Sequence, residues 1–283
     1  MPWLLHPEAE NVCCLGLATG ISAGGLETLD DPPKVTSVEL SEMVADVAKA
    51  HFREESRAFY ERAGNRIVCE DGRTLIAATD NEYDLVVADL FRPYGIGEGR
   101  LFSVEHFRNV KRSLKDNGMF CQWLPGHQLN ERQFKTIAAS FLEVFPETMV
   151  VNGGTLTATP SIGLCAWKSG KAWETTDLTA KIASFRKQKN VTDKLSLNAQ
   201  LLLAGVLKAD QYSDEPLNTL DNTLLELDAS RNWVLTDVRT DRGRGGGFLA
   251  GENFRSFMQK MHDEGTDPIL DPVHQKQFMQ LLK

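Results

Sequence analysis

Residues 12–24 read VCCLGLATGISAG, a short unbroken apolar run followed by a turn rich in glycine. An apolar run of this length is typical of a strand that is covered on both faces of a sheet. Glycines at positions 16, 20 and 24 let the backbone turn tightly and approach a ligand, because no Cβ stands in the way. The spacing is G-x-x-x-G, not the G-x-G-x-x-G of dinucleotide enzymes. The stretch predicts a strand and a ligand-binding turn that open an α/β domain.

Outward from this turn, short apolar runs alternate with amphipathic stretches, which is the pattern of βαβ units on a parallel sheet. Two last runs, 148–151 and 162–168, have no helix between them and indicate an antiparallel hairpin at the sheet edge. The sequence thus predicts an α/β fold with a Rossmann-like, doubly wound sheet of seven strands, mostly parallel. The other strands are expected at 12–16, 34–40, 66–70, 83–89 and 119–124, with helices at 41–52, 103–115 and 131–145.

The character of the sequence changes after residue 168. A polar loop is expected at 211–222 and an Arg/Gly tract occupies 239–247, where contact with RNA competes with a plain mobile loop. We therefore expect a core domain over residues 1–170 and a mainly helical C-terminal extension over residues 171–283. Helices of the extension are expected at 176–187, 195–207, 252–262 and 272–282.

Acidic residues follow three successive strands. Glu39 lies 19 residues after Gly20, where a carboxylate accepts both hydroxyls of a ribose. Asp71, followed by Gly72, ends the third strand, and Asp89 ends the fourth. Because parallel strands share one carboxyl edge, these acids together favour a nucleoside site. Each has a plainer alternative as a solvated acid or a helix N-cap, and Asp71 is the best N-cap candidate.

The composition excludes several classes of function. With 39 acidic against 31 basic residues, the net charge of −8 argues against nucleic-acid or anionic-membrane binding and suits a cationic substrate. The five cysteines form no C-x-x-C and the six histidines no H-x-x-x-H, so no metal site is predicted and a reduced chain is expected. No segment has the length of a bilayer span, and the N-terminus lacks a signal peptide, which predicts a soluble, cytoplasmic chain.

Four stretches together resemble the spermidine synthase family, within the class I S-adenosylmethionine-dependent transferase fold. They are residues 12–25, 35–40 (VTSVEL), 69–73 (CEDGR) and 83–107, and the similarity runs to about residue 168. The resemblance implies S-adenosylmethionine or its decarboxylated form as co-substrate, with no metal. It places Gly16 and Gly20 beside the methionine-derived part, Glu39 on the ribose, and Asp71 and Gly72 beside the adenine.

The resemblance also assigns residues to the acceptor side. Asp89 matches the first acid of the family's D-x-x-D-P segment and is the candidate catalytic residue that orients an amine. Gln122 matches a Gln on the fifth strand, and Tyr94 offers a ring to a cation, although packing is its plainer role. The loop at 218–222 resembles one that folds back toward the cleft and brings Asp221 there; the alternative is a polar surface turn.

Departures from the family leave the reaction open. The family's second acid falls on Arg92. There the guanidinium would face the ammonium of the substrate, and two like charges roughly 4 Å apart cost about 4 kcal/mol at an effective dielectric of about 20. The family's acid in the glycine motif falls on Thr19, and we expect no counterpart of its small N-terminal β-domain. The leading hypothesis is aminopropyl transfer to an amine or polyamine, in polyamine biosynthesis. The alternatives are a methyltransferase, a non-catalytic nucleoside-binding domain and, from the glycine turn and Glu39, an NAD-dependent oxidoreductase. Relatives are often dimeric, so a homodimer is a family expectation.

Overall fold

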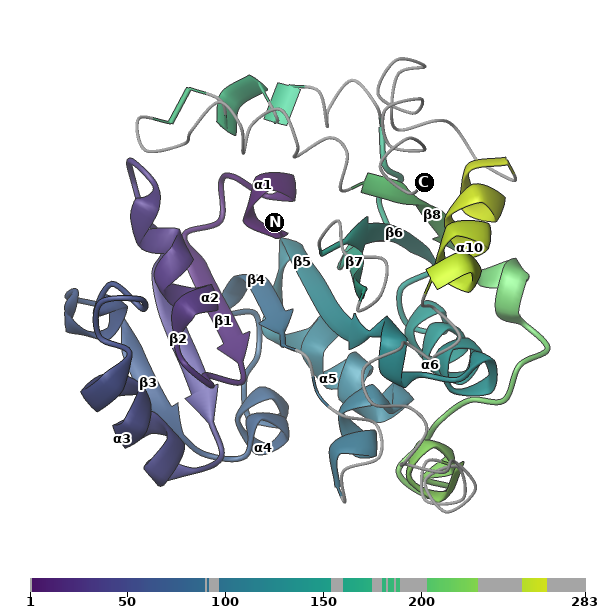
Figure 1. Cartoon of the computed structure of the whole chain (residues 1–283), viewed down its shortest axis with the longest axis horizontal. Coiled ribbons are helices and arrows are strands. Elements are labelled where there is room, and N and C mark those ends of the chain that lie inside the picture. The colour runs from purple at the N-terminus through teal and green to yellow at the C-terminus, as the bar shows by residue number, and fades with distance from the viewer. Residues whose placement is uncertain are drawn as a thin grey trace.

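The computed structural model describes residues 2–89, 91, 97–153, 160–174, 180–181, 183–185, 187–188, 203–228 and 251–263. One sheet runs through the middle of the molecule, with helices packed around it (Figure 1). In chain order its strands are β1 (Asn11–Leu15), β2 (Lys34–Glu39), β3 (Arg66–Cys69), β4 (Tyr83–Ala88), β5 (Leu114–Pro125), β6 (Glu147–Asn152), β7 (Ser161–Trp167) and β8 (Leu203–Lys208). Their order in the sheet is β3-β2-β1-β4-β5-β7-β6-β8.

One part of the sheet is parallel and the other antiparallel. Strand β1 pairs in parallel with β2 and β4, and β3 and β5 continue the parallel pairing outward. Strand β7 runs antiparallel to both β5 and β6. The predicted Rossmann-like sheet with an antiparallel hairpin is confirmed, and β1 to β4 begin and end within one residue of their predicted bounds.

The sheet has eight strands, one more than predicted. Strand β8 pairs antiparallel with β6, outside the hairpin. It begins within residues 195–207, which the sequence predicts as a helix; the described part of that stretch, 203–207, is a strand instead. A short apolar run fits a buried helix and a strand equally well, and the outer backbone groups of β6 need hydrogen-bond partners. Through β8 the predicted extension is joined to the sheet of the predicted core.

Helices cover both faces of the sheet. On one face α5 (Val104–Ser113) and α6 (Glu131–Leu142) pack through aromatic rings, with Phe107 at 5.1 Å from Phe141 and 6.1 Å from Phe120 between ring centroids. On the other face lie α1 (Pro2–Leu5), α2 (Ile21–Gly24) and the 3-10 helix η1 (Gly25–Thr28). Elsewhere in the described part are α3 (Glu42–His51), α4 (Gly72–Ala77), α10 (Gly251–Asp263), η2 (Phe59–Glu61), η3 (Glu98–Phe102), η4 (Gly126–Gln128) and η6 (Ala209–Tyr212).

The predicted helices at 41–52, 131–145 and 252–262 are confirmed. The helix predicted at 103–115 is present but ends at Ser113, because β5 begins at Leu114 and not at the predicted residue 119. The one at 272–282 lies outside the described residues, as does the Arg/Gly tract; of the one at 176–187, residues 180–181 and 183–185 are described as helical. Among the helices that the structure describes, none combines the length and the apolar character needed to span a bilayer.

Candidate functional site

The predicted nucleoside-binding residues lie along one edge of the sheet. Strands β3, β2, β1 and β4 are neighbours and run parallel, so their carboxyl ends meet there. The register pairs Val38 of β2 and Ala88 of β4 with Leu15 of β1. Glu39, Asp89 and the glycine turn therefore follow directly from three adjacent strand ends.

The glycine turn depends on backbone conformations that favour glycine. Gly16 has a φ of 90° and donates its N–H to the carbonyl of Val38 at 2.9 Å. Gly20 has a φ of 76° and donates to Leu17 at 2.7 Å, directly before α2. Side chains strain such conformations, so these two glycines fix the path of the turn.

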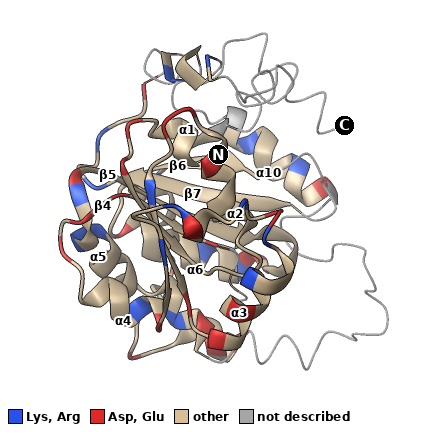
Figure 2. Cartoon of the chain, turned by 90° about the vertical axis from the view of Figure 1, so that its left-hand side faces the viewer, with Lys and Arg blue, Asp and Glu red and all other residues tan. Residues whose placement is uncertain are grey.

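The carboxylate of Glu39 holds this turn in place. Its Oε2 accepts hydrogen bonds from the backbone N–H groups of Leu17 at 3.3 Å and Ala18 at 3.4 Å. Its Oε1 accepts from the N–H of Ser41 at 3.1 Å, at the start of α3. Helix α3 contains Glu42 and Asp46 and shows acidic residues in Figure 2. The acid that is predicted to bind the ribose thus accepts hydrogen bonds from the backbone of the glycine turn, which is predicted to bind the methionine-derived part of the same ligand.

Asp71 has the local role that the sequence offered as an alternative. It is the N-cap of α4 and accepts from the N–H of Arg73 at 2.8 Å. Its other oxygen forms an ion pair with the Arg73 guanidinium, also at 2.8 Å. These hydrogen bonds from Arg73 lower the pKa of Asp71. The next residue, Gly72, begins α4 close to β1: a Cβ there would lie 3.4 Å from the Leu15 side chain.

Asp89 lies against the glycine turn. Its N–H donates to the carbonyl of Leu15 at 3.0 Å. A Cβ added to Gly16 would lie 3.4 Å from the Cβ of Asp89 and 3.5 Å from the ring of Phe91. Gly16 therefore lets the ends of β1 and β4 approach each other, with Asp89 at the contact.

Asp89 also lines a cavity of about 360 Å³ on the face of the sheet that carries α1 and α2. Glu39 and Asp71 are not among its lining residues. Burial raises the pKa of the Cys14 thiol in its wall to about 12, and nearby Asp89 adds to the shift. The lining residues are Pro2, Trp3, Val12, Cys14, Ser22, Leu26, Leu85, Val87, Asp89, Trp123, Gly153 and Ser161.

Sequence reasoning missed most of this cavity. Alternation along β1 and β4, in which Val12, Cys14, Leu85, Val87 and Asp89 share one face, was a usable signal for its floor. Its walls include α1, which is distant in sequence from β4, and the β6–β7 hairpin, which is distant in sequence from both strands. No local pattern connects those segments to Asp89.

The residues predicted on the acceptor side are less closely gathered. Gln122 is fully buried; its Nε2 donates to the carbonyl of Trp123 at 3.0 Å, and its Oε1 has no hydrogen-bond partner. It pairs with Ala88 on the sheet face opposite to Trp123 and does not line the cavity. Tyr94 and Arg92 lie outside the described residues. Asp221 is exposed in a turn.

The loop that carries Asp221 is hydrogen-bonded to η3 and to the start of α5. Asn218 is buried, donates its backbone N–H to Ser140 at 2.8 Å, and donates from Nδ2 to the carbonyl of Gly99 in η3 at 2.9 Å. Its carbonyl accepts from the N–H of Val104 at the start of α5, at 3.0 Å. The loop therefore packs back on the domain, and a role for Asp221 in the cleft stays a prediction.

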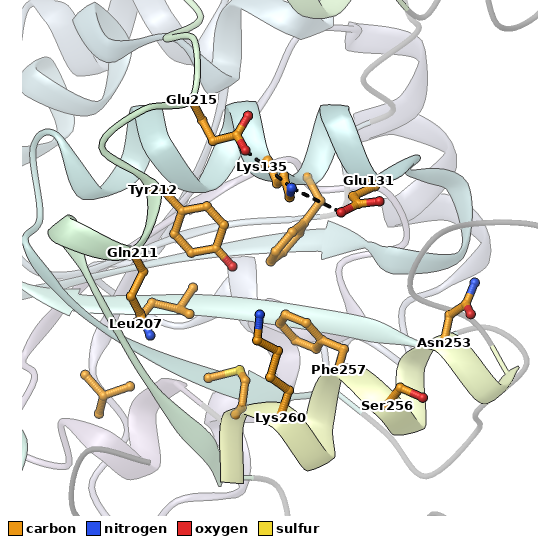
Figure 3. Close-up of a pocket in the computed structure, with 13 residues that line it drawn as sticks. Glu131, Lys135, Leu207, Gln211, Tyr212, Glu215, Asn253, Ser256, Phe257 and Lys260 are labelled. Atoms are coloured by element: carbon orange, nitrogen blue, oxygen red, sulfur yellow. Dashed lines mark ion pairs between the residues drawn. The ribbon is translucent and has the colours of Figure 1, made fainter. Parts of the chain in front are cut away.

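A second cavity, of about 730 Å³, lies between α6, β8, η6 and α10 (Figure 3). Lys135 joins two carboxylates on its wall, with Nζ at 3.1 Å from Glu131 and 3.3 Å from Glu215. Hydrogen bonds to these carboxylates raise the pKa of Lys135. None of the predicted site residues lines this cavity. In the part of the chain that the structure describes, no group of three or more His, Cys, Asp or Glu side chains is arranged to hold a metal ion.

Comparison with known proteins gives one family. The family profile described as "Spermine/spermidine synthase domain" matches residues 1–177. A polyamine aminopropyltransferase of Clostridium botulinum is 32% identical over 119 residues, which are 42% of this chain and 41% of that protein. One of Streptococcus uberis is 26% identical over 219 residues, 77% of this chain and 74% of the relative. With the first of these, the chain shares less than half of the relative's length.

The solved structures show the same fold. Spermidine synthase from Thermotoga maritima superposes with a TM-score of 0.58 at 22% sequence identity. The superposition covers 70% of this chain and 67% of that one. The likeness supports the fold of the sheet and its helices.

Proposed function

The chain belongs to the spermine/spermidine synthase family, and we propose that it transfers an aminopropyl group from decarboxylated S-adenosylmethionine to an amine. The proposal carries over to this chain the activity named for its curated relatives. The observation that supports it best is the contact of the Gly16 turn with both Glu39 and Asp89 at one edge of the sheet.

The residues at this edge fit a nucleoside with a positively charged sulfonium. Gly16 and Gly20 have no Cβ and a positive φ, so the turn presents backbone to a ligand. Glu39 accepts three backbone hydrogen bonds, and since a carboxylate offers about four acceptor sites, one site is left for a ribose hydroxyl. Asp89 supplies negative charge where the positive part of the co-substrate would lie.

The chemistry asks little of the protein beyond position and proton removal. The amine nitrogen forms a bond to the aminopropyl carbon while the bond from that carbon to sulfur breaks. The electron pair goes to sulfur, which leaves as a neutral thioether, and the new ammonium loses one proton. Asp89 orients the amine and accepts this proton; holding the reactants in line supplies most of the remaining rate.

Binding and product analysis test the proposal together. Calorimetric titration with methylthioadenosine, S-adenosylmethionine and its decarboxylated form is expected to show binding. The decarboxylated donor is expected to bind more tightly than the carboxylated one. Mass spectrometry is then expected to find an aminopropylated amine. The absence of binding by all three nucleosides, even at high concentration, contradicts the proposal.

A matched pair of variants locates the chemistry. Asp89→Asn is expected to lower kcat/KM by roughly 100-fold or more, because a general base is removed. Asp46→Asn makes the same charge change at an exposed position of α3 and is expected to leave kcat/KM unchanged. A marked preference for the carboxylated donor redirects the assignment to methyl transfer, and tight binding without any product redirects it to a non-catalytic nucleoside-binding domain.

A further inference from the structure

Asn218 lies at the centre of a hydrogen-bond network that joins the C-terminal part of the chain to the domain. The residue is only 1% exposed. Its backbone N–H donates to Ser140 of α6 at 2.8 Å, and its carbonyl accepts from the N–H of Val104 at 3.0 Å. Its Nδ2 donates to the carbonyl of Gly99 at 2.9 Å, and its Oδ1 accepts from the N–H of Leu225 at 3.2 Å. Both backbone groups and both side-chain groups of this buried residue are thus used, and two of these bonds hold η3 and the start of α5.

Further contacts extend along η3 and into the first turn of α5. A Cβ added to Gly99 would lie 2.6 Å from Cγ of Glu226, so the two segments are closely packed. The guanidinium of Arg100 lies 3.9 Å from a carboxylate oxygen of Glu226. Leu220 donates its backbone N–H to the carboxylate of Glu105 at 3.1 Å. The stretch 218–226 therefore grips η3 and α5 at several points, with Asn218 as its buried member.

The segment held in this way connects two of the acids at the carboxyl edge of the sheet. Asp89 begins it, and its N–H is bonded to the carbonyl of Leu15 at 3.0 Å. The ring of Phe91 lies against the glycine turn, and η3 follows from Glu98. Helix α5 then packs against α4, which Asp71 caps. A shift of η3 therefore acts on the chain that leaves Asp89, because reacting groups depend on the residues that support them from behind.

Asn218 lies outside residues 1–177, the part of the chain that the family profile matches. Building on the proposed function, we infer that Asn218 is a positioning residue for aminopropyl transfer. By holding η3 and the start of α5, it keeps Asp89 in the orientation that the incoming amine requires. A displacement of about 1 Å caused far from the reacting atoms lowers a rate by up to about 100-fold. Glu39 and the glycine turn are hydrogen-bonded to each other, so donor binding does not depend on Asn218.

Two asparagines of the same loop give a matched test. Oδ1 of Asn222 accepts from the N–H of Thr219 at 2.9 Å, and its Nδ2 donates to the carbonyl of Leu217 at 2.9 Å, so these bonds stay within the loop. Asn218→Asp and Asn222→Asp each keep an oxygen acceptor and remove a donor to a carbonyl. With the decarboxylated donor and 1,4-diaminobutane, Asn218→Asp is expected to lower kcat by roughly tenfold or more. Asn222→Asp is expected to stay within about twofold of the unmodified chain.

Donor binding separates positioning from a folding defect. Titration of Asn218→Asp with methylthioadenosine is expected to give the same number of sites per chain as the unmodified protein and an affinity within about twofold. A partly unfolded variant instead loses sites and kcat together. Ser140→Ala removes the acceptor for the N–H of Asn218 and repeats the test if Asn218→Asp does not fold. Equal kcat in Asn218→Asp and Asn222→Asp, or a fall in kcat matched by an equal fall in sites, overturns the inference.

The two proposals fail in different ways. If no nucleoside binds to the unmodified chain, the proposed function fails, and the inference fails with it. If product forms and Asn218→Asp keeps full turnover, only the inference is overturned. If a nucleoside binds but no product forms, amide hydrogen exchange around Asp89 decides. Faster exchange there in Asn218→Asp than in Asn222→Asp supports the link from Asn218 to Asp89, and equal exchange overturns it.

Discussion

The carboxylate of Glu39 accepts a hydrogen bond from the backbone N–H of Leu17 at 3.3 Å, which ties the end of β2 to the glycine turn after β1. Ala18 donates to the same oxygen at 3.4 Å. A single side chain thus shapes the turn and, under the proposed function, also binds the ribose. Loss of its charge is expected to affect ligand binding more than folding.

Glu39→Gln is expected to weaken methylthioadenosine binding by roughly 10- to 100-fold, since hydrogen bonds to charged groups are each worth about 1.5–3 kcal/mol. Isothermal titration calorimetry measures the affinity, and thermal unfolding checks that the variant is folded. Glu42→Gln removes an equal charge from an exposed position of α3 and is the control. Equal affinities in the two variants would show that Glu39 only shapes the turn.

Gly24 and Gly25 form a matched pair for the packing of the turn. Both have right-handed helical backbone angles, with φ values of −64° and −59°. A Cβ at Gly24 would collide with the backbone carbonyl of Ser56, whereas a Cβ at Gly25 would meet nothing within 4 Å. Gly24→Ala is expected to lower the free energy of unfolding by about 1–3 kcal/mol, and Gly25→Ala to leave it equal or slightly higher. Urea unfolding measures both, and similar values for the two variants contradict the prediction.

His106 is expected to make stability depend on pH. Burial, with the Arg73 guanidinium nearby and against the weaker influence of Asp71, lowers the pKa of this histidine from 6.5 to about 4. Below pH 6.5 the unfolded chain takes up a proton that the folded chain does not, so stability falls as the pH drops from about 6.5 to 4. The contribution at pH 4.5 is about 2 kcal/mol.

The variant His106→Phe isolates this contribution. Between pH 7 and pH 4.5 its free energy of unfolding is expected to fall by about 2 kcal/mol less than that of the unmodified chain. His51→Asn, at an exposed histidine, is expected to follow the unmodified chain. Urea unfolding at both pH values gives the comparison, and parallel pH profiles for His106→Phe and the unmodified chain refute the assignment.

Two substitutions of Asp71 separate capping from base binding. Asp71→Ala removes the acceptor for the N–H of Arg73 and is expected to cost about 1 kcal/mol of stability. Asp71→Asn keeps an oxygen acceptor and is expected to stay within about 0.5 kcal/mol, because the ion pair that it loses is partly exposed. Under the proposed function, Asp71→Asn still binds methylthioadenosine several-fold more weakly. Unchanged affinity in titration calorimetry would leave Asp71 with its capping role alone.

The sequence was sufficient for the parallel half of the sheet and the acids at its edge. Strands β1 and β4 are nearly continuous apolar runs, because both faces of each are covered, and such runs have clear ends; β2 combines two valines with buried Thr36 and Ser37. The acid after each strand then falls at the shared edge by geometry alone. Which partner each acid has there depends on side chains, so the N-cap role of Asp71 was offered only as an alternative and its ion pair with Arg73 was not predicted.

Packing between distant segments explains the failures. Met43 and Val47 predict a helix correctly, yet they are 74% and 44% exposed, while Ala45 and Ala48 face the sheet. Small side chains let α3 lie close to β2 and β3. The spacing of apolar residues predicts the helix but not which of its side chains face the sheet. The wall that Trp3 and Trp123 give to the cavity, likewise, depends on segments about 120 residues apart.

Strand β8 has a consequence for anyone who shortens the chain. It pairs along β6 from Glu147 to Val151, and five of the six residues of β6 are buried. A fragment cut at residue 177, where the family profile ends, would leave that row of backbone donors and acceptors open on an apolar strand. An exposed edge strand pairs readily with strands of other chains, so the fragment would be prone to aggregation or domain swapping.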